Sequence, residues 1–259
     1  MKNINNENKM QKPSVFYRLA FIVVFMTEML WMNDCYLKEW NATVAAANGC
    51  EVELDRTAFY PESGGQPSDA GKIICNGNEF IIVSSKKQGN NVIHIVDREG
   101  LSIGSNIRCS LDWELRYKFM RFHTACHVIS AVFHSQAGAL ITGNQIGFEK
   151  ARIDFNIENF DKEKIADYAE KANEIAGQGH AIKIYSMKRE DAMHIPNITK
   201  LANVLPPSIS ELRIVEIVGV DVQADGGCHV ANTREIGTIR IAKLENKGKS
   251  NRRVEFVLE

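Results

Sequence analysis

Two histidines stand four residues apart in the segment His123-Thr-Ala-Cys-His127. If this segment is helical, both imidazoles lie on one face, one turn apart, and can share a metal ion. Much further along the chain, Asp225-Gly-Gly-Cys-His229 places a carboxylate and a third imidazole at the same spacing. Nitrogen ligands with one carboxylate or thiolate suit zinc. The pattern therefore predicts one zinc ion per chain, bound by His123, His127, Asp225 and His229.

Cys228 is the alternative to Asp225 as the fourth ligand. Its thiolate would be the softer ligand, but it adjoins His229, and neighbouring residues seldom reach one metal from a regular element. We therefore rank Asp225 first and Cys228 second. Bound zinc polarises a carbonyl group and lowers the pKa of water, which is the chemistry that ester hydrolysis needs.

The first histidine pair is expected on a long helix from about Asp112 to Ala137. Apolar residues recur there at helical spacing, and Gly138 is placed to end the helix. Such a helix also carries charges just before the first histidine, and charges of this kind commonly form a solvated face. Beside a metal site they are predicted to contact phosphates of a nucleic acid. These cations are Arg116, Lys118 and Arg121.

Between Asp34 and Asp112, short β-forming runs alternate with Asn-Gly and Gly-Asn turns. Strands at this spacing without intervening helices predict a small β-barrel. Inside it lies Thr57-Ala-Phe-Tyr-Pro-Glu-Ser-Gly-Gly-Gln-Pro-Ser-Asp69. Gly64 and Gly65 alone are typical of a tight surface loop, because glycine reaches backbone conformations closed to other residues. The flanking residues make this segment more specific than a loop of that kind.

The second half of the chain mixes strands and helices without strict alternation. We expect a helix from Asp161 that ends at Gly177, a central strand over Leu212–Val220, and a terminal hairpin from Ile236. This order predicts an α+β fold, with an N-terminal small β-barrel followed by an α/β two-layer sandwich. The expected division is an extension over 1–26, a barrel domain over 27–112 and a metal-binding domain over 113–259.

Composition limits the setting and the partners. The chain has 259 residues and a net charge of −1, so nucleic acid would have to be attracted by local patches. Its six cysteines have no paired spacing, which indicates a reducing compartment, the cytoplasm. The apolar run Val15–Met26 contains Arg18 and is shorter than the roughly 20 residues of a membrane span. We interpret it as part of the extension, with a membrane anchor as the alternative.

Four segments together resemble the AlaX-type alanyl-tRNA editing proteins, freestanding relatives of the editing domain of alanyl-tRNA synthetase. The likeness runs from about Thr27 to Glu259. It implies a zinc-dependent deacylase that hydrolyses the ester of tRNA(Ala) mischarged with serine, and often glycine. The segments are Thr57–Asp69, His123–His127, Ile182–Ala192 and Asp225–Gly237.

The resemblance also assigns roles to single residues. The family binds zinc through a cysteine at the position of Asp225, and a carboxylate can take that place. A threonine hydroxyl near the metal recognises the serine side chain in the family, and Thr142 is the candidate here. Gln66 follows the two glycines, and we expect this triplet to approach the acceptor end of tRNA or to close over the site. Thr142 and Gln66 are thus the candidate catalytic residues, and Gly64 and Gly65 join the candidate tRNA-binding set.

The expected partner is mischarged tRNA(Ala), with no DNA or membrane partner, and the expected assembly is a monomer or weak dimer. A second hypothesis keeps the fold but not the chemistry. In this hypothesis, the aspartate at position 225 reflects a loss of stoichiometric zinc binding. The chain would then be a catalytically inactive tRNA-binding protein.

Overall fold

Six strands of the first half close into a barrel in the order β2-β3-β7-β6-β5-β8. Alternate residues of each strand point inward, as in Trp40, Ala42 and Val44 of the first strand. The predicted small barrel is therefore confirmed. Its strands are β2 (Glu39–Asn48), β3 (Glu51–Leu54), β5 (Gly71–Cys75), β6 (Asn78–Gln88), β7 (Asn91–Val96) and β8 (Asn106–Leu111).

The computed structural model describes residues 26–158, 161–196, 198 and 210–259. The expected extension therefore lies outside the described residues, except for Met26. Just after it, β1 (Glu28–Met29) pairs in parallel with β4 (Arg56–Thr57), and a short 3-10 helix, η1 (Leu30–Met32), follows. No helix within the described ranges combines the length and the apolar character that crossing a membrane would require.

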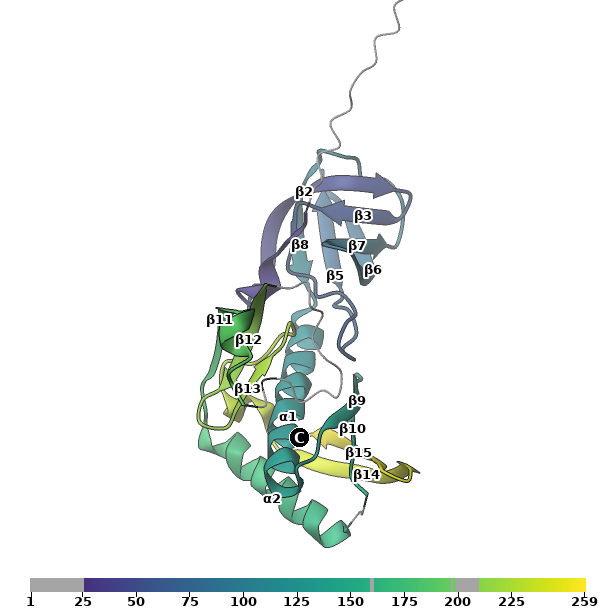
Figure 1. Cartoon of the computed structure of the whole chain (residues 1–259). Helices are drawn as coiled ribbons and strands as arrows, with labels where there is room; N and C mark the ends of the chain where they lie inside the picture. The colour runs from purple at the N-terminus through teal and green to yellow at the C-terminus, as the bar shows by residue number, and fades with distance from the viewer. Residues whose placement is uncertain (1–25, 159–160, 197, 199–209) are drawn as a thin grey trace, which may run out of the picture.

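Helix α1 (Trp113–Ala137) leaves the barrel directly after β8 and forms the axis of the rest of the molecule (Figure 1). The Asp112 side chain caps its first turn by accepting a hydrogen bond from the Leu115 N–H at 3.1 Å. Gly138 ends it in the left-handed conformation, with φ +62°. The predicted helix is confirmed at both ends.

Two sheets pack around α1 (Figure 1). One has the strand order β14-β15-β10-β9 and the other β11-β12-β13, so the strand predicted to be central, β12, does lie between two others. The strands are β9 (Ile141–Ile146), β10 (Ala151–Phe155), β11 (Ile182–Lys188), β12 (Glu211–Ile217), β13 (Asp221–Ala224), β14 (Ile239–Gly248) and β15 (Asn251–Leu258). The helices are α2 (Lys162–Gln178), α3 (Arg189–Ala192) and the 3-10 helix η2 (Thr233–Ile236).

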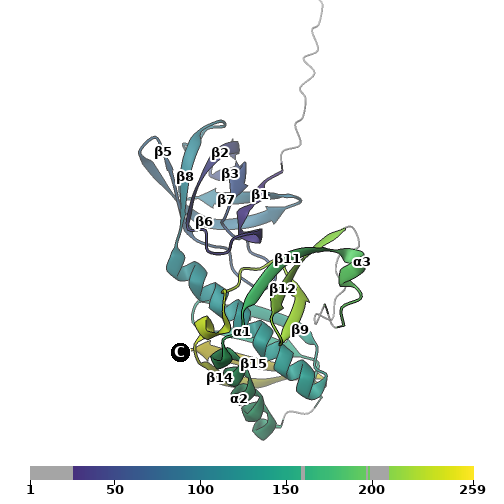
Figure 2. The same cartoon turned by 90° about the vertical axis from the view of Figure 1, so that its left-hand side faces the viewer.

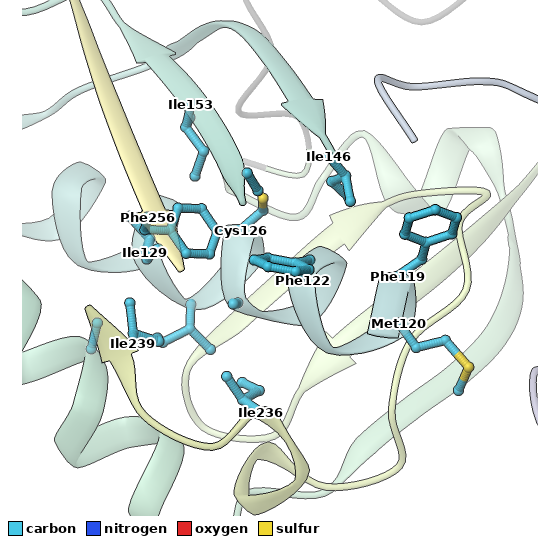
Figure 3. Close-up of a cluster of buried hydrophobic side chains, with 14 of the residues drawn as sticks. Phe119, Met120, Phe122, Cys126, Ile129, Ile146, Ile153, Ile236, Ile239 and Phe256 are labelled. Carbon is cyan, nitrogen blue, oxygen red and sulfur yellow. The ribbon is translucent and has the colours of Figure 1, made fainter. Parts of the chain in front are cut away.

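The larger core lies between α1 and the four-stranded sheet. Figure 3 shows Phe119, Phe122 and Ile129 of α1 facing the sheet side chains. Figure 2 shows α2 alongside α1, and the barrel at the other end of the long helix. The C-cap of α2 is Gly179, with φ +80°, and the prediction of Gly177 was wrong by two residues. The predicted α+β class, a barrel followed by an α/β body, is confirmed.

A buried ion pair joins the barrel to α1. Arg116 and Asp69 are both fully buried, and the Arg116 Nε lies 3.0 Å from Asp69 Oδ1. The same guanidinium donates to the Cys35 carbonyl at 3.0 Å, and Asp69 also accepts from the Tyr60 N–H at 2.6 Å. Because the guanidinium has no exposed surface, it cannot reach a phosphate, and the predicted tRNA contact of Arg116 is replaced by a structural role. The pair fixes the glycine-rich segment against the helix.

Candidate metal centre

The two histidines of α1 meet the loop after β13 at a single point. One ligand atom each from His123, His127, Asp225 and His229 lies within 4.8 Å of all the others. The ring centroids of His123 and His229 are 4.5 Å apart, and those of His127 and His229 are 4.6 Å apart. The three imidazoles are buried and Asp225 is partly exposed. The four residues predicted to share a metal are thus brought together.

The hydroxyl of Thr124 determines which ring nitrogen of His229 carries the proton. Its hydroxyl donates to the Met120 carbonyl at 3.0 Å and accepts from the Val230 N–H at 3.2 Å. The remaining lone pair can accept from His229 Nδ1 at 3.1 Å, so Nδ1 carries the ring proton. His229 Nε2 then presents a lone pair 3.0 Å from the carboxylate oxygen Oδ2 of Asp225. Two acceptors at this distance are the arrangement that a cation between them stabilises.

Gln66 plays the same part for His123. Its Oε1 lies 2.8 Å from His123 Nδ1, which leaves Nε2 on the side of Asp225, 3.7 Å from Oδ1. Gln66 is fully buried, and its Nε2 has no hydrogen-bond partner among the described residues. On the third imidazole, His127 Nδ1 lies 3.8 Å from Asp221 Oδ2, beyond hydrogen-bond distance. Outer hydrogen bonds such as those of Gln66 and Thr124 set the tautomer and orientation of metal-binding histidines.

The protonation states also suit a cation. Burial lowers the pKa of His123 to about 4 and holds the pKa of His229 well below its usual value. Burial alone would raise the pKa of Asp225, but the electrostatic effect of the surrounding imidazoles, with His123 foremost, lowers it well below its usual value. At neutral pH, His123 and His229 are therefore neutral and Asp225 is ionised, the forms that bind a divalent metal. Three nitrogens and one carboxylate oxygen fit zinc.

Gly227 lets the loop pass directly over the ring of His123. A Cβ at this position would lie 2.1 Å from His123 Cε1, closer than any side chain tolerates. The Gly227 N–H donates to Asp225 Oδ2 at 2.7 Å, and Arg213 Nη1 donates to the Asp225 carbonyl at 2.9 Å. Gly227 thus allows the carboxylate and the imidazoles to meet.

Cys228 is not among the ligand atoms that meet. It is fully buried, and its hydrogen bond with Cys35 lowers the pKa of the Cys35 thiol. The structure therefore groups Asp225 with the histidines, and the alternative ligand Cys228 is excluded from the set.

A cavity of about 170 Å³ opens beside the ligand atoms. Gly64 reaches its wall from the barrel, and the Gly64 carbonyl accepts from Asn144 Nδ2 of β9 at 2.7 Å. The Gly65 carbonyl accepts from the Ile146 N–H at 2.7 Å, and a Cβ on Gly65 would lie 2.5 Å from the Asn144 carbonyl oxygen. The glycine segment and β9 therefore form one side of the cavity together. A larger groove of about 560 Å³ lies on the barrel wall and contains none of the ligand residues.

Thr142 does not face this cavity. It is exposed on β9, and its hydroxyl donates to Asn251 Oδ1 at 3.0 Å. The polar side chains that line the cavity besides the ligands are Asn144 and Gln223. Gln223 precedes Asp225 by two residues, and strand periodicity from Asp225 could have identified it.

The two remaining predicted cations differ in their surroundings. Arg121 donates through Nε and Nη2 to the Ile236 carbonyl, at 3.1 and 2.7 Å, and so ties η2 to α1. The ammonium of Lys118 lies 3.9 Å from the centre of the Phe148 ring. Neither is brought to the ligand atoms.

Two family models match the chain. The model described as "Threonyl and Alanyl tRNA synthetase second additional domain" matches residues 212–255, which include the Asp225–His229 segment. The model described as "tRNA synthetases class II (A)" matches residues 5–115.

Whole-length relatives give a sharper comparison. The chain is 47% identical over 243 residues to the alanyl-tRNA editing protein AlaX-M of Methanosarcina mazei, covering 90% of this chain and 97% of that protein. It is 44% identical over 237 residues to AlaX-M of Saccharolobus solfataricus, covering 90% and 100%. An alanine–tRNA ligase of Ignicoccus hospitalis is 34% identical over 234 residues, which span 26% of the ligase. The chain belongs to the AlaX family of alanyl-tRNA editing proteins.

Proposed function

We propose that this protein hydrolyses the ester of tRNA(Ala) mischarged with serine, and with glycine, at one zinc ion per chain. The ion would be held by His123, His127, Asp225 and His229. The observation that carries the proposal is the convergence of these four ligand atoms within 4.8 Å, beside a cavity. The names of the relatives support tRNA(Ala) as the partner. Six free cysteines among the described residues support the cytoplasm as the setting.

Zinc in this site would supply a Lewis acid for the ester carbonyl and for a water molecule. The protein's own side chains prepare the site for it. Gln66 and Thr124 each hold a proton on a histidine Nδ1, so that the Nε2 lone pairs of His123 and His229 point inward. The ionised Asp225 offsets the positive charge of the ion and helps to hold it. Gln66 thus acts as a positioning residue.

Selectivity against correctly charged tRNA requires a polar contact. Alanine is smaller than serine, so size alone cannot reject it, whereas a site that hydrogen-bonds the serine hydroxyl discriminates against its loss. Gln223 donates from Nε2 to Asp221 Oδ2 at 2.6 Å, which leaves its carbonyl oxygen to accept from such a hydroxyl. Asn144 stands on the same cavity wall as the glycine segment. We assign the reading of serine to these two side chains in place of Thr142.

The direct test is release of serine from purified Ser-tRNA(Ala), compared with release of alanine from Ala-tRNA(Ala). We expect rapid hydrolysis of the serine ester, slow hydrolysis of the alanine ester, and loss of activity in the His123→Ala variant. The exposed barrel residue Ile103, changed to alanine, serves as the matched control. Binding of tRNA without hydrolysis, in a zinc-free protein, would support the inactive tRNA-binding protein instead.

A further inference from the structure

The hairpin between β9 and β10 exposes an aromatic ring. Phe148 is 59% exposed, and it is the only aromatic residue among the exposed large hydrophobic residues of the described chain. The turn that presents it is closed by a hydrogen bond from the Gly147 N–H to the Lys150 carbonyl at 2.9 Å. An ordered turn therefore holds an apolar ring in water, where burial against a partner would stabilise it.

A cation from α1 lies over the same ring. The Lys118 ammonium is 3.9 Å from the ring centre and forms no ion pair with any described residue. The Arg98 guanidinium over Phe80 gives the contrast, because that ring is buried and that cation pairs with Asp97 at 3.3 Å. Of these two pairs, only the first leaves a ring and a positive charge available together. A third cation, Lys38, lies 4.3 Å from the centre of the Trp113 ring, but that ring is half-buried and already stacks on Tyr117. Proteins bind single-stranded nucleic acid by this combination, in which bases stack on rings and cations meet the backbone.

Strand β9 links the Phe148–Lys118 pair to the cavity, because β9 leads into the hairpin that carries Phe148 and contributes Asn144 to the cavity wall. Two residues before Phe148, Ile146 donates to the Gly65 carbonyl of the glycine segment. Figure 3 shows Ile146 beside Phe119, the residue after Lys118, and in Figure 1 the end of β9 faces the loop that descends from the barrel. Lys118 precedes the ligand His123 by five residues, a rise of about 7.5 Å along the helix and a turn of about 140° around it. The two side chains therefore leave α1 about one and a half turns apart, on different faces.

We propose that Phe148 and Lys118 form the binding surface for the 3′-terminal base of the acceptor strand. The base stacks on the Phe148 ring, the Lys118 ammonium contacts the adjoining phosphate, and the aminoacyl ester on the same ribose enters the cavity. This inference rests on the proposed function, because the surface would bind the part of the aminoacyl-tRNA that the metal ligands do not contact.

The test compares Phe148→Leu with Phe148→Trp in deacylation of Ser-tRNA(Ala). The leucine variant loses the stacking face and is expected to raise KM about 5- to 100-fold, while the tryptophan variant stays near the wild type. A second substrate, in which the terminal adenine is replaced by an abasic ribose, completes a cycle. The wild type should lose the same factor on this substrate, and Phe148→Leu should lose nothing further. If the substitution and the abasic substrate lowered deacylation independently, so that their effects added in free energy, the proposal would be overturned.

Lys118→Met tests the cation separately. The salt dependence of tRNA binding should become shallower by about one phosphate contact, whereas Arg98→Met, the matched cation over a ring, should leave the slope unchanged. An unaltered slope in Lys118→Met would contradict the assignment.

The two proposals fail in different ways. If the wild-type protein and Phe148→Leu hydrolyse Ser-tRNA(Ala) equally well, the stacking surface is refuted and the proposed function remains intact. Wild-type protein with no hydrolysis refutes the proposed function. In that case, binding of uncharged tRNA by fluorescence anisotropy still tests the surface, since Phe148→Leu and Phe148→Trp must then differ in Kd.

Discussion

Replacing Gly227 by alanine places a methyl group where the ring of His123 now lies. The new Cβ would stand 2.1 Å from His123 Cε1, whereas ordinary contacts begin near 3.4 Å, so ring or loop must move by about 1.3 Å. Metal–ligand distances tolerate deviations of only about 0.2 Å. The loop carries Asp225 and His229, so movement of either partner separates the loop ligands from those of α1.

The expected magnitude follows from this displacement. Disturbing only the outer partners of a ligand lowers metal affinity by about 10- to 100-fold. Displacing a ligand itself should exceed this, so we expect Gly227→Ala to weaken zinc binding by at least about 100-fold, or about 2.7 kcal/mol. Competition with a chromophoric chelator measures the affinity, and deacylation of Ser-tRNA(Ala) at limiting zinc should fall in parallel.

The neighbouring glycine provides the matched control. A Cβ on Gly226 would meet no atom within 4 Å. We expect Gly226→Ala to retain zinc affinity within about threefold, because substitutions without steric conflict usually change free energies by less than about 0.5 kcal/mol. Equal zinc affinities for Gly226→Ala and Gly227→Ala would refute the reasoning, because the close passage of the loop over His123 would then have no consequence.

Three further predictions concern the residues around the site and the barrel. Gln66→Met removes the acceptor for His123 Nδ1 and should weaken zinc binding by about 10- to 100-fold, measured by the same chelator competition. The stability of this variant without metal should change little, because removing the unpartnered buried Nε2 of Gln66 offsets the lost hydrogen bond to His123. Arg116→Met leaves Asp69 buried without its cation and should lower the free energy of unfolding by about 3–5 kcal/mol in urea titrations; a loss below about 1 kcal/mol would contradict the structural role. Burial lowers the pKa of His94 from 6.5 to about 3, so this ring is neutral in the fold but protonated in the unfolded chain between those values. The stability that the neutral His94 ring contributes to the fold is therefore fully present above pH 6.5 and is lost as the pH falls towards 3. The stability of His94→Asn should depend less steeply on pH in this window, by about 1.4 kcal/mol per unit, and equal slopes would rule out this titration.

The ligand set could be predicted because its information is local. His123 and His127 share a helix face through their spacing, and Asp225 and His229 lie in one short loop. Only the meeting of the two pairs required the fold. The choice between Asp225 and Cys228 depended on the path of the loop, which Gly227 sets by passing over the histidine ring.

Long-range partners could not be predicted in the same way. A charge such as Arg116 on an amphipathic helix is usually solvated, and nothing in the adjacent sequence indicates that it will form a buried ion pair with Asp69. The role of Gln66 likewise depends on a contact between the glycine-rich segment and His123, which lies 57 residues later in the sequence. Thr142 was assigned by resemblance alone, and its hydroxyl donates to Asn251 of β15 instead of facing the cavity.

The zinc content of the protein tests the central claim most directly. Purified wild-type chain, saturated with zinc and freed of excess metal, should carry one ion per chain by elemental analysis, and the His123→Ala, His229→Ala double variant should carry none. A wild type without stoichiometric zinc, or a double variant that keeps it, would mean that these four side chains do not form the metal site.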